Sequence, residues 1–600
     1  MIALDKIPDG PSVPEGFLGV GYGTSGFRSH AEGPINAMDH VAYRCGLIFA
    51  AMPLISRGYP DVYSEYLLKS KDSDSEVIGM GCVITASHNP YQDNGVKLFT
   101  PSGEMLESEW EQLMDEFVNT KGSVQELLKE YLKVSQGFKE HLETFRKRYS
   151  IRIIVGYDSR STSPRLVSFF KKGVNAVLDA LELDTSECIV IGKVTTPTLP
   201  FLLNNGYASV SSDSVYLDYI EGVFSDVVQK FTKFGLLKET FTIDTNEELY
   251  YDCSFGVSSF KIWRFCNCIR LLGMNPYVCN SSIPGDPSEM FNRLNAGCGS
   301  DYVMSKNTVP QSVKDMDIYI GKRFCSFDGD ADRVIYFVPG RDGQCTVFHG
   351  DHILLVKLLF LRSLLKDCTF KLSVGVLQTR YSNGAITAYI HSLISKWNSE
   401  SSGIEWHHEF FNSGVKHAQR AAKKYDLSVY YEKNGHGAIV SRVNTFESTC
   451  SCLNELSSKE NNGNREILSS VLRLFYPGGD AIVNSLVFEL ALKVLDMSIY
   501  DCVRLYTDLP FMNTRYEIPK HIMTRFSTSI DNDSVLVRPK EFQESLESQV
   551  QLYDGARAFV RPSGTENILR IYVEANSEDV VKVLYDFIIE GIERALNDTE

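Results

Sequence analysis

Residues 84–90 place a serine hydroxyl in a polar turn directly after an apolar run. Residues 81–84 predict a short buried strand, and Asn89 with Pro90 is a turn signal that ends regular structure. Active sites of open α/β sheets gather at such strand ends, and the hydroxyl of Ser87 could carry a phosphoryl group there. Capping of a turn or helix is the alternative role, and it is the commoner one for an isolated serine.

Asp328, Asp330 and Asp332 stand at alternate positions after a second apolar run, and hard oxygen ligands of this kind suit Mg²⁺. An EF-hand is excluded, because counting from Asp328 puts Arg333 where glycine is needed and Pro339 where a bidentate glutamate belongs. Two alternatives stay open: an aspartyl phosphatase that uses Asp328 as its nucleophile, and an exposed acidic turn. The third carboxylate, Arg333 and the apolar flanks favour a metal loop.

Residues 561–567 combine an arginine, two hydroxyl side chains and a glycine that allows close backbone approach, which suits a phosphate monoester. The apolar runs 558–560 and 568–573 predict strands on both sides, although a simple turn is the alternative. Residues 432–437 follow the strand-like run 427–431 and offer donors and acceptors for sugar hydroxyls. For that segment alone, a turn is the favoured reading.

Two cations accompany these segments, Arg28 in the glycine-containing loop 23–28 and Lys97 shortly after Ser87. Each could also lie in a solvated turn.

The elements that must position these groups belong to a large α/β protein. Six hundred residues suggest about three to five domains. Residues 151–155 and 188–191 read as strands and residues 163–183 as an amphipathic helix, which is the α/β pattern. Polar or turn-rich stretches predict four domains: residues 1–210 with the Ser87 loop, 211–342 with the metal loop, 343–500 with the sugar loop, and 501–600 with the phosphate loop. Segments 69–76 and 447–465 read as exposed inserted loops.

Composition excludes several classes. The apolar fraction of 43% and charged fraction of 23% are ordinary for a folded soluble protein, and the net charge of −16 argues against nucleic-acid or anionic-membrane binding. The N-terminus lacks a secretory pattern, so a cytoplasmic location is expected. Residues 352–365 are too short to span a bilayer and predict a buried amphipathic helix. Fourteen scattered cysteines predict reduced thiols.

Taken together and in this order, the four loops resemble those of the α-D-phosphohexomutase superfamily over essentially the full chain. Residues 432–437 are similar to the sugar loop of members that act on N-acetylglucosamine phosphates, rather than to those of glucose or mannose mutases. Residues 378–379, 414–417 and 505–510 are similar to the same subgroup.

The resemblance implies four α/β domains around a central active-site cleft. Ser87 would carry the phosphoryl group, with Arg28 and Lys97 acting at the reacting phosphate and His436 assisting proton transfer. Ser87, Asp328, Asp330 and Asp332 would hold one Mg²⁺. The remaining implied roles are substrate binding, by the sugar-loop residues Glu432, Asn434, Gly435 and His436 and by the phosphate-binding residues Arg561, Ser563, Gly564, Thr565 and Arg570.

The implied activity is interconversion of N-acetylglucosamine 6-phosphate and 1-phosphate through a phosphoserine and an activating hexose 1,6-bisphosphate, feeding UDP-N-acetylglucosamine synthesis. The implied partner is a sugar phosphate, with no nucleic acid or membrane, and the implied state is a monomer. A glucose or mannose phosphomutase, or a non-catalytic sugar-phosphate-binding protein on the same scaffold, stays open. Four departures from the family pattern (Lys433, Asn567 and the segments 252–256 and 411–413) put the sugar preference in more doubt than the reaction class.

Overall fold

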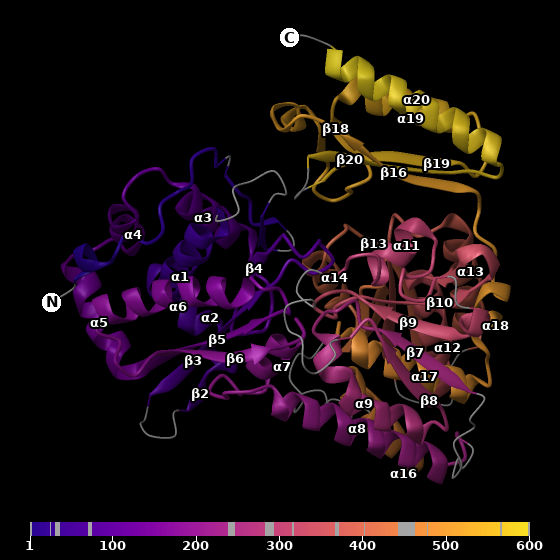
Figure 1. Ribbon diagram of the computed structural model, residues 1–600, viewed down its shortest axis with the longest axis horizontal. Helices are drawn as coiled ribbons and strands as arrows, with labels where there is room; N and C mark the ends of the chain where they lie inside the picture. Colours follow the sequence, from indigo (N-terminus) through magenta and orange to yellow (C-terminus); the bar gives the residue numbers. More distant parts are fainter. Residues whose placement is uncertain are drawn as a thin grey trace. The chain divides into compact units, whose positions relative to one another are not determined.

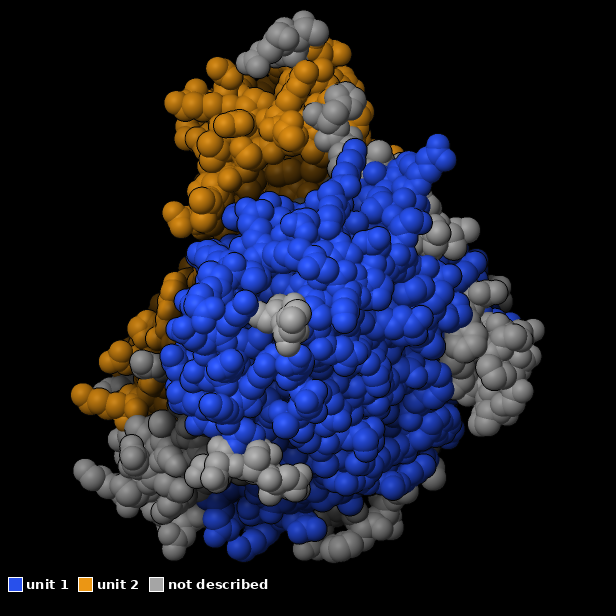
Figure 2. Space-filling view, turned by 90° about the vertical axis from the view of Figure 1, so that its left-hand side faces the viewer, with its two compact units in different colours: residues 1–347, 443–490 blue, residues 348–442, 491–600 orange. Residues whose placement is uncertain are grey.

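The computed structural model describes most of the chain: residues 3–17, 19–23, 26–29, 37–69, 75–237, 247–281, 293–314, 317–366, 371–400, 403–441, 462–476, 478–563 and 567–597. The chain forms two compact units, coloured separately in Figure 2. Unit 1 comprises residues 1–347 and 443–490, and unit 2 comprises residues 348–442 and 491–600. Residues 447–461 of one predicted insertion and 70–74 of the other lie outside the described residues.

The first sheet of unit 1 has the order β1-β4-β3-β5-β6, with β2 paired to β3. The three strands β3, β5 and β6 are parallel, and β4 runs antiparallel to β3. The expected strands near 81–84, 151–155 and 188–191 are therefore confirmed. The strands are β1 (Phe27–Arg28), β2 (Leu68–Lys69), β3 (Glu76–Ile84), β4 (Gly95–Phe99), β5 (Tyr149–Tyr157) and β6 (Glu187–Lys193).

Helices α1 and α6 cross in close contact beside this sheet (Figure 1). A Cβ on Gly46 of α1 would lie 2.1 Å from the Phe170 carbonyl oxygen, and one on Gly173 of α6 would lie 2.1 Å from the Tyr43 carbonyl oxygen. Only glycine at both positions allows this backbone approach. The helix predicted at 163–183 is thus confirmed as α6. The helices are α1 (Ala37–Ile55), α2 (Tyr59–Val62), α3 (Ser108–Asn119), α4 (Val124–Leu132), α5 (Gln136–Arg148), α6 (Ser163–Ala180) and α7 (Thr198–Asn204).

The second sheet of unit 1 has the order β11-β10-β9-β7-β8. Because β11 pairs with β10, the predicted domain boundary at residue 342 falls inside this sheet. Its strands are β7 (Glu248–Asp252), β8 (Asn275–Cys279), β9 (Arg323–Phe327), β10 (Val334–Pro339) and β11 (Cys345–Phe348).

Two helices from the predicted third segment pack in unit 1. Tyr219 of α8 donates to the Arg473 carbonyl of α16 at 2.9 Å, and the Phe488 ring of α17 lies 4.4 Å from that of Tyr336. The segment 462–490 therefore belongs with the second sheet, and the division into four domains stays a prediction. The helices are α8 (Ser214–Lys233), α9 (Ser258–Leu271), α11 (Ser300–Lys306), α16 (Asn462–Phe475) and α17 (Ala481–Leu495), the last ending in unit 2.

Unit 2 contains a four-stranded sheet of order β13-β12-β14-β15 and a three-stranded antiparallel sheet of order β16-β20-β19. The strands predicted at 427–431, 558–560 and 568–573 are confirmed as β14, β19 and β20. Helix α18 occupies the predicted boundary near residue 500. The elements are α12 (Gly350–Leu365), β12 (Leu372–Thr379), α13 (Gly384–Ser399), β13 (Ile404–Phe411), α14 (Val415–Ala422), β14 (Leu427–Tyr431), β15 (Gly437–Ser441), α18 (Ile499–Arg504), β16 (Phe511–Glu517), β17 (Ser527–Thr528), β18 (Leu536–Arg538), α19 (Lys540–Val550), β19 (Arg557–Pro562), β20 (Ile568–Glu574) and α20 (Glu578–Asn597).

Helix α12 corrects one expectation. The helix is buried, as predicted, but burial extends around most of its surface rather than along one face and includes Lys357. The Lys357 ammonium donates to the Tyr431 hydroxyl at 2.5 Å, and burial lowers the pKa of Lys357 well below its usual value. Among the described helices, none has an apolar stretch long enough to traverse a bilayer. All cysteines in the described segments are free, as predicted.

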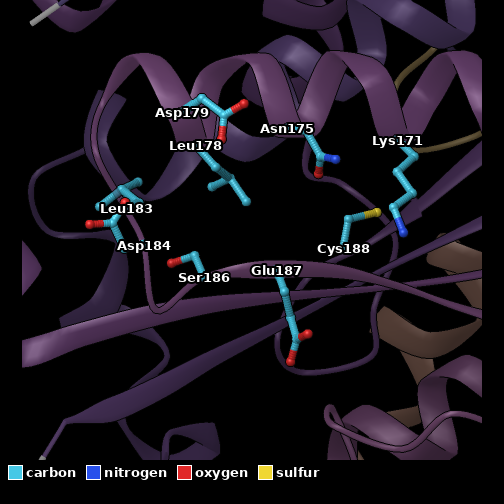
Figure 3. A pocket seen from close by; sticks show the side chains of 9 residues that line it. All are labelled: Lys171, Asn175, Leu178, Asp179, Leu183, Asp184, Ser186, Glu187 and Cys188. Carbon is cyan, nitrogen blue, oxygen red and sulfur yellow. The ribbon is translucent and has the colours of Figure 1, made fainter.

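A pocket of about 380 Å³ opens in unit 1 beside α6 and the start of β6 (Figure 3). Its lining is mostly polar and includes Lys171, Asp179 and Glu187. It contains none of the residues predicted to take part in chemistry.

Candidate active site

Ser87 lies in the turn after β3, where the side chain is 1% exposed and the backbone adopts the left-handed region with φ of 49°. Its hydroxyl donates to Asp330 Oδ2 at 2.9 Å, and it accepts from Lys97 Nζ at 2.8 Å and from Arg28 Nη2 at 3.4 Å. Strand pairing brings these cations close, because Lys97 on β4 is the register partner of Val83 on β3. A serine that only caps a turn or helix does not require a buried carboxylate and two cations around its hydroxyl.

The three aspartates form a buried loop between β9 and β10, with candidate ligand oxygens all within 4.8 Å of one another. Asp328 and Asp330 are 0% exposed, so an exposed acidic turn is ruled out. Asp328 Oδ2 and Asp330 Oδ1 are buried and accept no hydrogen bond among the described residues. Buried carboxylate oxygens without donors fit a divalent cation, since such atoms are otherwise costly. The residues therefore fit Mg²⁺.

Charge is concentrated in this loop. Burial and the carboxylates of Asp332 and Asp330 raise the pKa of Asp328 well above its usual range. Burial also favours a lower pKa for Lys97, but Asp330 and Asp332 outweigh it and raise that pKa. Burial, with the neighbouring Arg333, lowers the pKa of Arg28 to about 10. Both cations thus remain protonated near neutral pH beside the serine.

Neighbouring segments support the metal loop through the backbone. Thr196 donates its N–H to the Asp330 carbonyl at 3.1 Å and its hydroxyl to Asp330 Oδ2 at 2.6 Å. The N–H of Ala481 at the start of α17 donates to the Ala331 carbonyl at 2.9 Å. The altered turn at 252–256 also lies here, because a Cβ on Gly256 would be 2.5 Å from the Gly329 carbonyl oxygen. Gly256 therefore has no room for a side chain beside the metal loop.

The sugar loop predicted at 432–437 is a tight turn between β14 and β15. Glu432 N–H donates to the His436 carbonyl at 2.8 Å, and Gly435, with φ of 90°, supplies the left-handed turn. The Glu432 carboxylate accepts from the Asn434 amide at 3.3 Å and from Gly414 N–H at 3.1 Å. The loop is thereby fixed before any ligand binds.

Lys433 points away from the polar groups of this loop. Its ammonium lies 3.6 Å from the centroid of the Phe511 ring and 3.8 Å from Asp508 Oδ2. The side chain is only 11% exposed. This departure from the family pattern therefore contacts Asp508 and Phe511, the first residue of β16.

The phosphate loop begins at the end of β19, where Arg561 Nε lies 3.1 Å from Asp533 Oδ2. Arg570 on β20 is the register partner of Arg561, and Ser563 N–H donates to the Ile568 carbonyl at 2.9 Å. Gly564 and Thr565 lie outside the described residues, as do Thr24 and Ser25 of the 23–28 loop. Asn567, a departure from the pattern, accepts at its carbonyl from Ile518 N–H at 3.0 Å.

One turn links the two substrate loops of unit 2. Ser413 N–H donates to Asp533 Oδ2 at 2.9 Å, while the adjacent Gly414 N–H donates to Glu432. The Asn412 side chain exchanges hydrogen bonds with the 530–533 segment, donating to the Ile530 carbonyl at 2.7 Å and accepting from Asp533 N–H at 3.1 Å. The unusual segment 411–413 thus connects the sugar loop to the arginine of the phosphate loop.

Comparisons with known proteins identify the family of this chain. Family models match three regions: phosphoglucomutase/phosphomannomutase, alpha/beta/alpha domain I, at residues 70–125; phosphoacetylglucosamine mutase AMG1, domain III, at 349–497; and phosphoglucomutase/phosphomannomutase, C-terminal domain, at 532–591. The phosphoacetylglucosamine mutase of Sus scrofa is 30% identical over 96% of this chain and 94% of its own length. The chain belongs to the phosphoacetylglucosamine mutase family.

Solved structures of similar proteins share the fold of this family. The crystal structure of an N-acetylglucosamine-phosphate mutase in its product complex superposes with a TM-score of 0.77 at 27% identity, covering 98% of both chains. The N-acetylphosphoglucosamine mutase of Aspergillus fumigatus, in complex with GlcNAc-6P and magnesium, gives a TM-score of 0.73 at 27% identity over 96% of both chains. A variant of that fungal enzyme was crystallised with glucose 1,6-bisphosphate.

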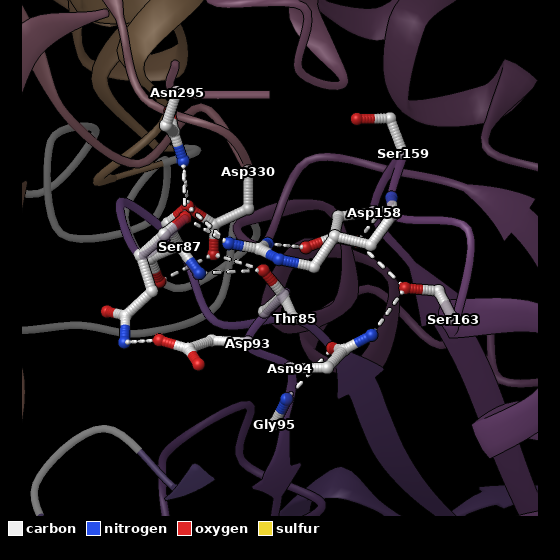
Figure 4. Close-up of polar contacts among 12 residues, drawn as sticks. Thr85, Ser87, Asp93, Asn94, Gly95, Asp158, Ser159, Ser163, Asn295 and Asp330 are labelled. Carbon is white, nitrogen blue, oxygen red and sulfur yellow. Dashed lines mark hydrogen bonds and ion pairs between the residues drawn. The ribbon is translucent and has the colours of Figure 1, made fainter. Parts of the chain in front are cut away.

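Sequence reasoning missed several side chains around the serine in this family member. Arg160 and Asn295 both donate to backbone carbonyls of the serine loop. Figure 4 shows Asn295 beside this loop. Thr196 and Arg160 follow the ends of β6 and β5, so the rule that sites gather at strand ends could have found them. Asn295 follows no strand and belongs to no motif, so no sequence signal indicated it.

Proposed function

We propose that the protein interconverts N-acetylglucosamine 6-phosphate and N-acetylglucosamine 1-phosphate. The observation that carries this proposal is the Ser87 hydroxyl, held by Asp330, Lys97 and Arg28 beside a carboxylate cluster that fits Mg²⁺. Such a hydroxyl can accept and return a phosphoryl group. The 432–437 loop, in a family whose members include an enzyme crystallised with GlcNAc-6P, favours the N-acetylated sugar.

The reaction would proceed in two transfers. Phosphorylated Ser87 gives its phosphoryl group to the free hydroxyl of the bound monophosphate, the P–O bond to Ser87 breaks, and the proton lost by that hydroxyl is balanced by protonation of the Ser87 oxygen. The resulting 1,6-bisphosphate turns over and returns its other phosphoryl group to Ser87, which restores the phosphoserine. Because either phosphate must be held at the distal position, recognition there has to rest on charge, which the arginine of the phosphate loop provides.

The residues of unit 1 would assist each transfer. Lys97 Nζ, 2.8 Å from Ser87 Oγ, is placed to stabilise negative charge on that oxygen as the phosphoryl group leaves, and Arg28 lies on the same oxygen. Asp328, Asp330 and Asp332, with the serine phosphate, would hold one Mg²⁺, which when bound supplies further charge neutralisation. In unit 2, Glu432 and Asn434 would bind sugar hydroxyls, and Arg561, Ser563 and Arg570 the non-reacting phosphate.

Conversion of N-acetylglucosamine 6-phosphate by the purified protein with Mg²⁺ and catalytic glucose 1,6-bisphosphate tests the proposal, with ³¹P NMR detecting the 1-phosphate. Ser87→Ala should abolish turnover, whereas Ser305→Ala, at an exposed serine on α11, should not. Full activity of Ser87→Ala would refute the phosphoserine mechanism. A higher kcat/KM with glucose or mannose 6-phosphate would instead favour the other mutases.

A non-catalytic sugar-phosphate-binding protein is the remaining alternative. It would bind hexose phosphates yet never acquire phosphate on Ser87, which intact mass spectrometry distinguishes. For the working enzyme we propose a cytoplasmic monomer that supplies N-acetylglucosamine 1-phosphate for UDP-N-acetylglucosamine synthesis. Light scattering should then give a mass near 67.5 kDa.

A further inference from the structure

The backbone of Ser87 is held in a conformation that residues with side chains rarely adopt. Its φ is 49°, and such left-handed geometry persists only where the surroundings over-determine it. The Ser87 N–H donates to Thr85 Oγ1 at 3.0 Å, and Asn89 N–H donates to the Ala86 carbonyl at 3.0 Å. These local bonds satisfy two N–H groups of the turn but leave the carbonyls of Ser87 and Asn89 to be held by other residues.

Two side chains from distant parts of unit 1 hold both carbonyls. Asn295 Nδ2 donates to the Ser87 and Asn89 carbonyls, each at 2.9 Å. Arg160 Nη2 donates to the same two oxygens, at 3.3 Å and 2.6 Å. Figure 4 shows the Asn295 amide directed at the serine turn. Each of the two carbonyls therefore accepts hydrogen bonds from both side chains.

The two donors are anchored differently. Arg160 is 1% exposed and paired with the buried Asp158, which also accepts from Ser163 Oγ at 2.8 Å. Its removal would leave a buried carboxylate without its cation, which destabilises the fold itself. Asn295 is half-buried and carries no charge, so its amide can be removed at much lower structural cost.

Asn295 also joins the serine turn to the metal loop. Its N–H donates to the Ser254 carbonyl at 3.0 Å, in the turn after β7. A Cβ on Gly329 of the metal loop would lie 3.0 Å from Asn295 Nδ2 and 2.6 Å from the Ser87 carbonyl oxygen. The amide thus lies where the turn after β3 meets the loop between β9 and β10.

We propose that Asn295 is a positioning residue for phosphoryl transfer, which holds the Ser87 turn so that its hydroxyl stays on Asp330 and Lys97. It touches neither of those groups and acts through the backbone of the serine. A small rotation of the Ser87 backbone would move Oγ away from both partners, and misplacement of a reacting atom by about 1 Å can cost roughly 100-fold in rate. This inference rests on the proposed phosphoserine function.

The test replaces Asn295 without straining its own backbone. Asn295 has φ of 57°, so Asn295→Gly removes the amide while keeping a residue that adopts this geometry freely. Asn307→Gly is the matched control, because Asn307 is an exposed asparagine of unit 1 with φ of 49°. Asn295→Asp is the second variant, since it keeps the shape but replaces the donor with a carboxylate facing two carbonyls.

We expect Asn295→Gly and Asn295→Asp to lower kcat by roughly 100-fold, with KM for the sugar phosphate within about threefold of the wild type. The rate at which Ser87 takes a phosphoryl group from glucose 1,6-bisphosphate, followed by intact mass, should fall by a similar factor. A merely structural role would lower the melting temperature without this split between kcat and KM. Should Asn295→Gly fail to fold, Asn295→Asp decides the outcome.

Two results would overturn the inference: phosphoryl uptake by folded Asn295 variants at the Asn307→Gly rate, or a raised KM with unchanged kcat. If the wild-type protein itself never takes up a phosphoryl group on Ser87, the proposed function fails instead. The two failures are therefore distinguishable in one set of measurements.

Discussion

At the scale of single residues, Lys433 is the departure from the family pattern within the sugar loop, and its contacts show what the side chain does. Its ammonium lies over the Phe511 ring and near Asp508 rather than among the groups offered to a sugar. Asp508 Oδ2 also lies 3.6 Å from His349 Nε2. Burial raises the pKa of Asp508, but the contact with His349 and the charge of Lys433 outweigh it, and the pKa is lowered. Lys433 therefore contacts Asp508 and the first residue of β16, which accounts for a lysine at this position without a sugar contact.

We predict that Lys433→Ala keeps the sugar preference. The ratio of kcat/KM for N-acetylglucosamine 6-phosphate to that for glucose 6-phosphate should stay within about threefold of the wild type, because no sugar contact is removed. Loss of the cation–π contact and the partly buried ion pair should cost about 1 kcal/mol of stability. Lys366→Ala, at an exposed lysine of unit 2, is the control. A tenfold loss of discrimination would show that Lys433 contacts the substrate.

The residue scale also shows where sequence reasoning succeeds. Ser87 and Asp328 could be predicted because each follows an apolar run that forms a strand, and strand ends are where sites gather. The position of the Lys433 side chain could not be predicted, because it depends on Phe511, which is 78 positions away along the chain. Asn295 could not be predicted for the same reason, since its partners are backbone carbonyls of a turn in the first sheet.

At the scale of elements, the candidate site depends on two loops that meet backbone to backbone. Gly329 of the metal loop has no room for a side chain, because a Cβ would lie 2.6 Å from the Ser87 carbonyl oxygen. Gly256 is equally restricted on the other side, where a Cβ would lie 2.5 Å from the Gly329 carbonyl oxygen. Gly329 thus sets the distance between the loops after β3 and β9, and Gly256 sets the distance between the turn after β7 and the metal loop.

We predict that Gly329→Ala separates these loops. The new methyl group must displace the Ser87 carbonyl or the metal loop, so kcat should fall roughly 100-fold because the serine and the carboxylates lose their alignment. Gly58→Ala is the matched control, since a Cβ there would meet nothing within 4 Å. Circular dichroism should show both variants folded. Wild-type kcat in folded Gly329→Ala would mean that the close approach of the loops is not needed for catalysis.

Local elements were predicted well, and non-local packing was not. Strands β5, β14 and β20 and helix α6 follow from hydrophobic periodicity, which is written in consecutive residues. The placement of α16 and α17 does not, because it rests on contacts such as Lys230 Nζ to Ser470 Oγ at 2.6 Å, between segments 240 residues apart. Continuity along the chain assigned 462–490 to the third segment, whereas the packing assigns it to unit 1.

At the scale of the whole molecule, the groups proposed for the reaction divide between the two units. Unit 1 contains Ser87, Arg28, Lys97 and the three aspartates, all joined by the contacts described above. Unit 2 contains the 432–437 loop and Arg561, joined through the Ser413–Gly414 turn and Asp533. Under the proposed function, the residues of unit 1 would carry out phosphoryl transfer and those of unit 2 would recognise the substrate.

Substitutions in unit 2 should therefore weaken substrate binding, whereas those in unit 1 should lower the rate of turnover. Asp533 Oδ2 lies 3.1 Å from Arg561 Nε and orients the guanidinium, which we propose binds a phosphate. Each hydrogen bond to a charged group is worth about 1.5–3 kcal/mol. Arg561→Ala should raise KM roughly 10- to 100-fold with a smaller change in kcat, while Arg538→Ala, at an exposed arginine of the same unit, changes neither.

Ser87→Ala should lose turnover yet bind N-acetylglucosamine 6-phosphate, with a Kd from calorimetry within about threefold of the wild type. If Ser87→Ala lost binding, or Arg561→Ala lost kcat at unchanged KM, recognition and transfer would not be divided between the units.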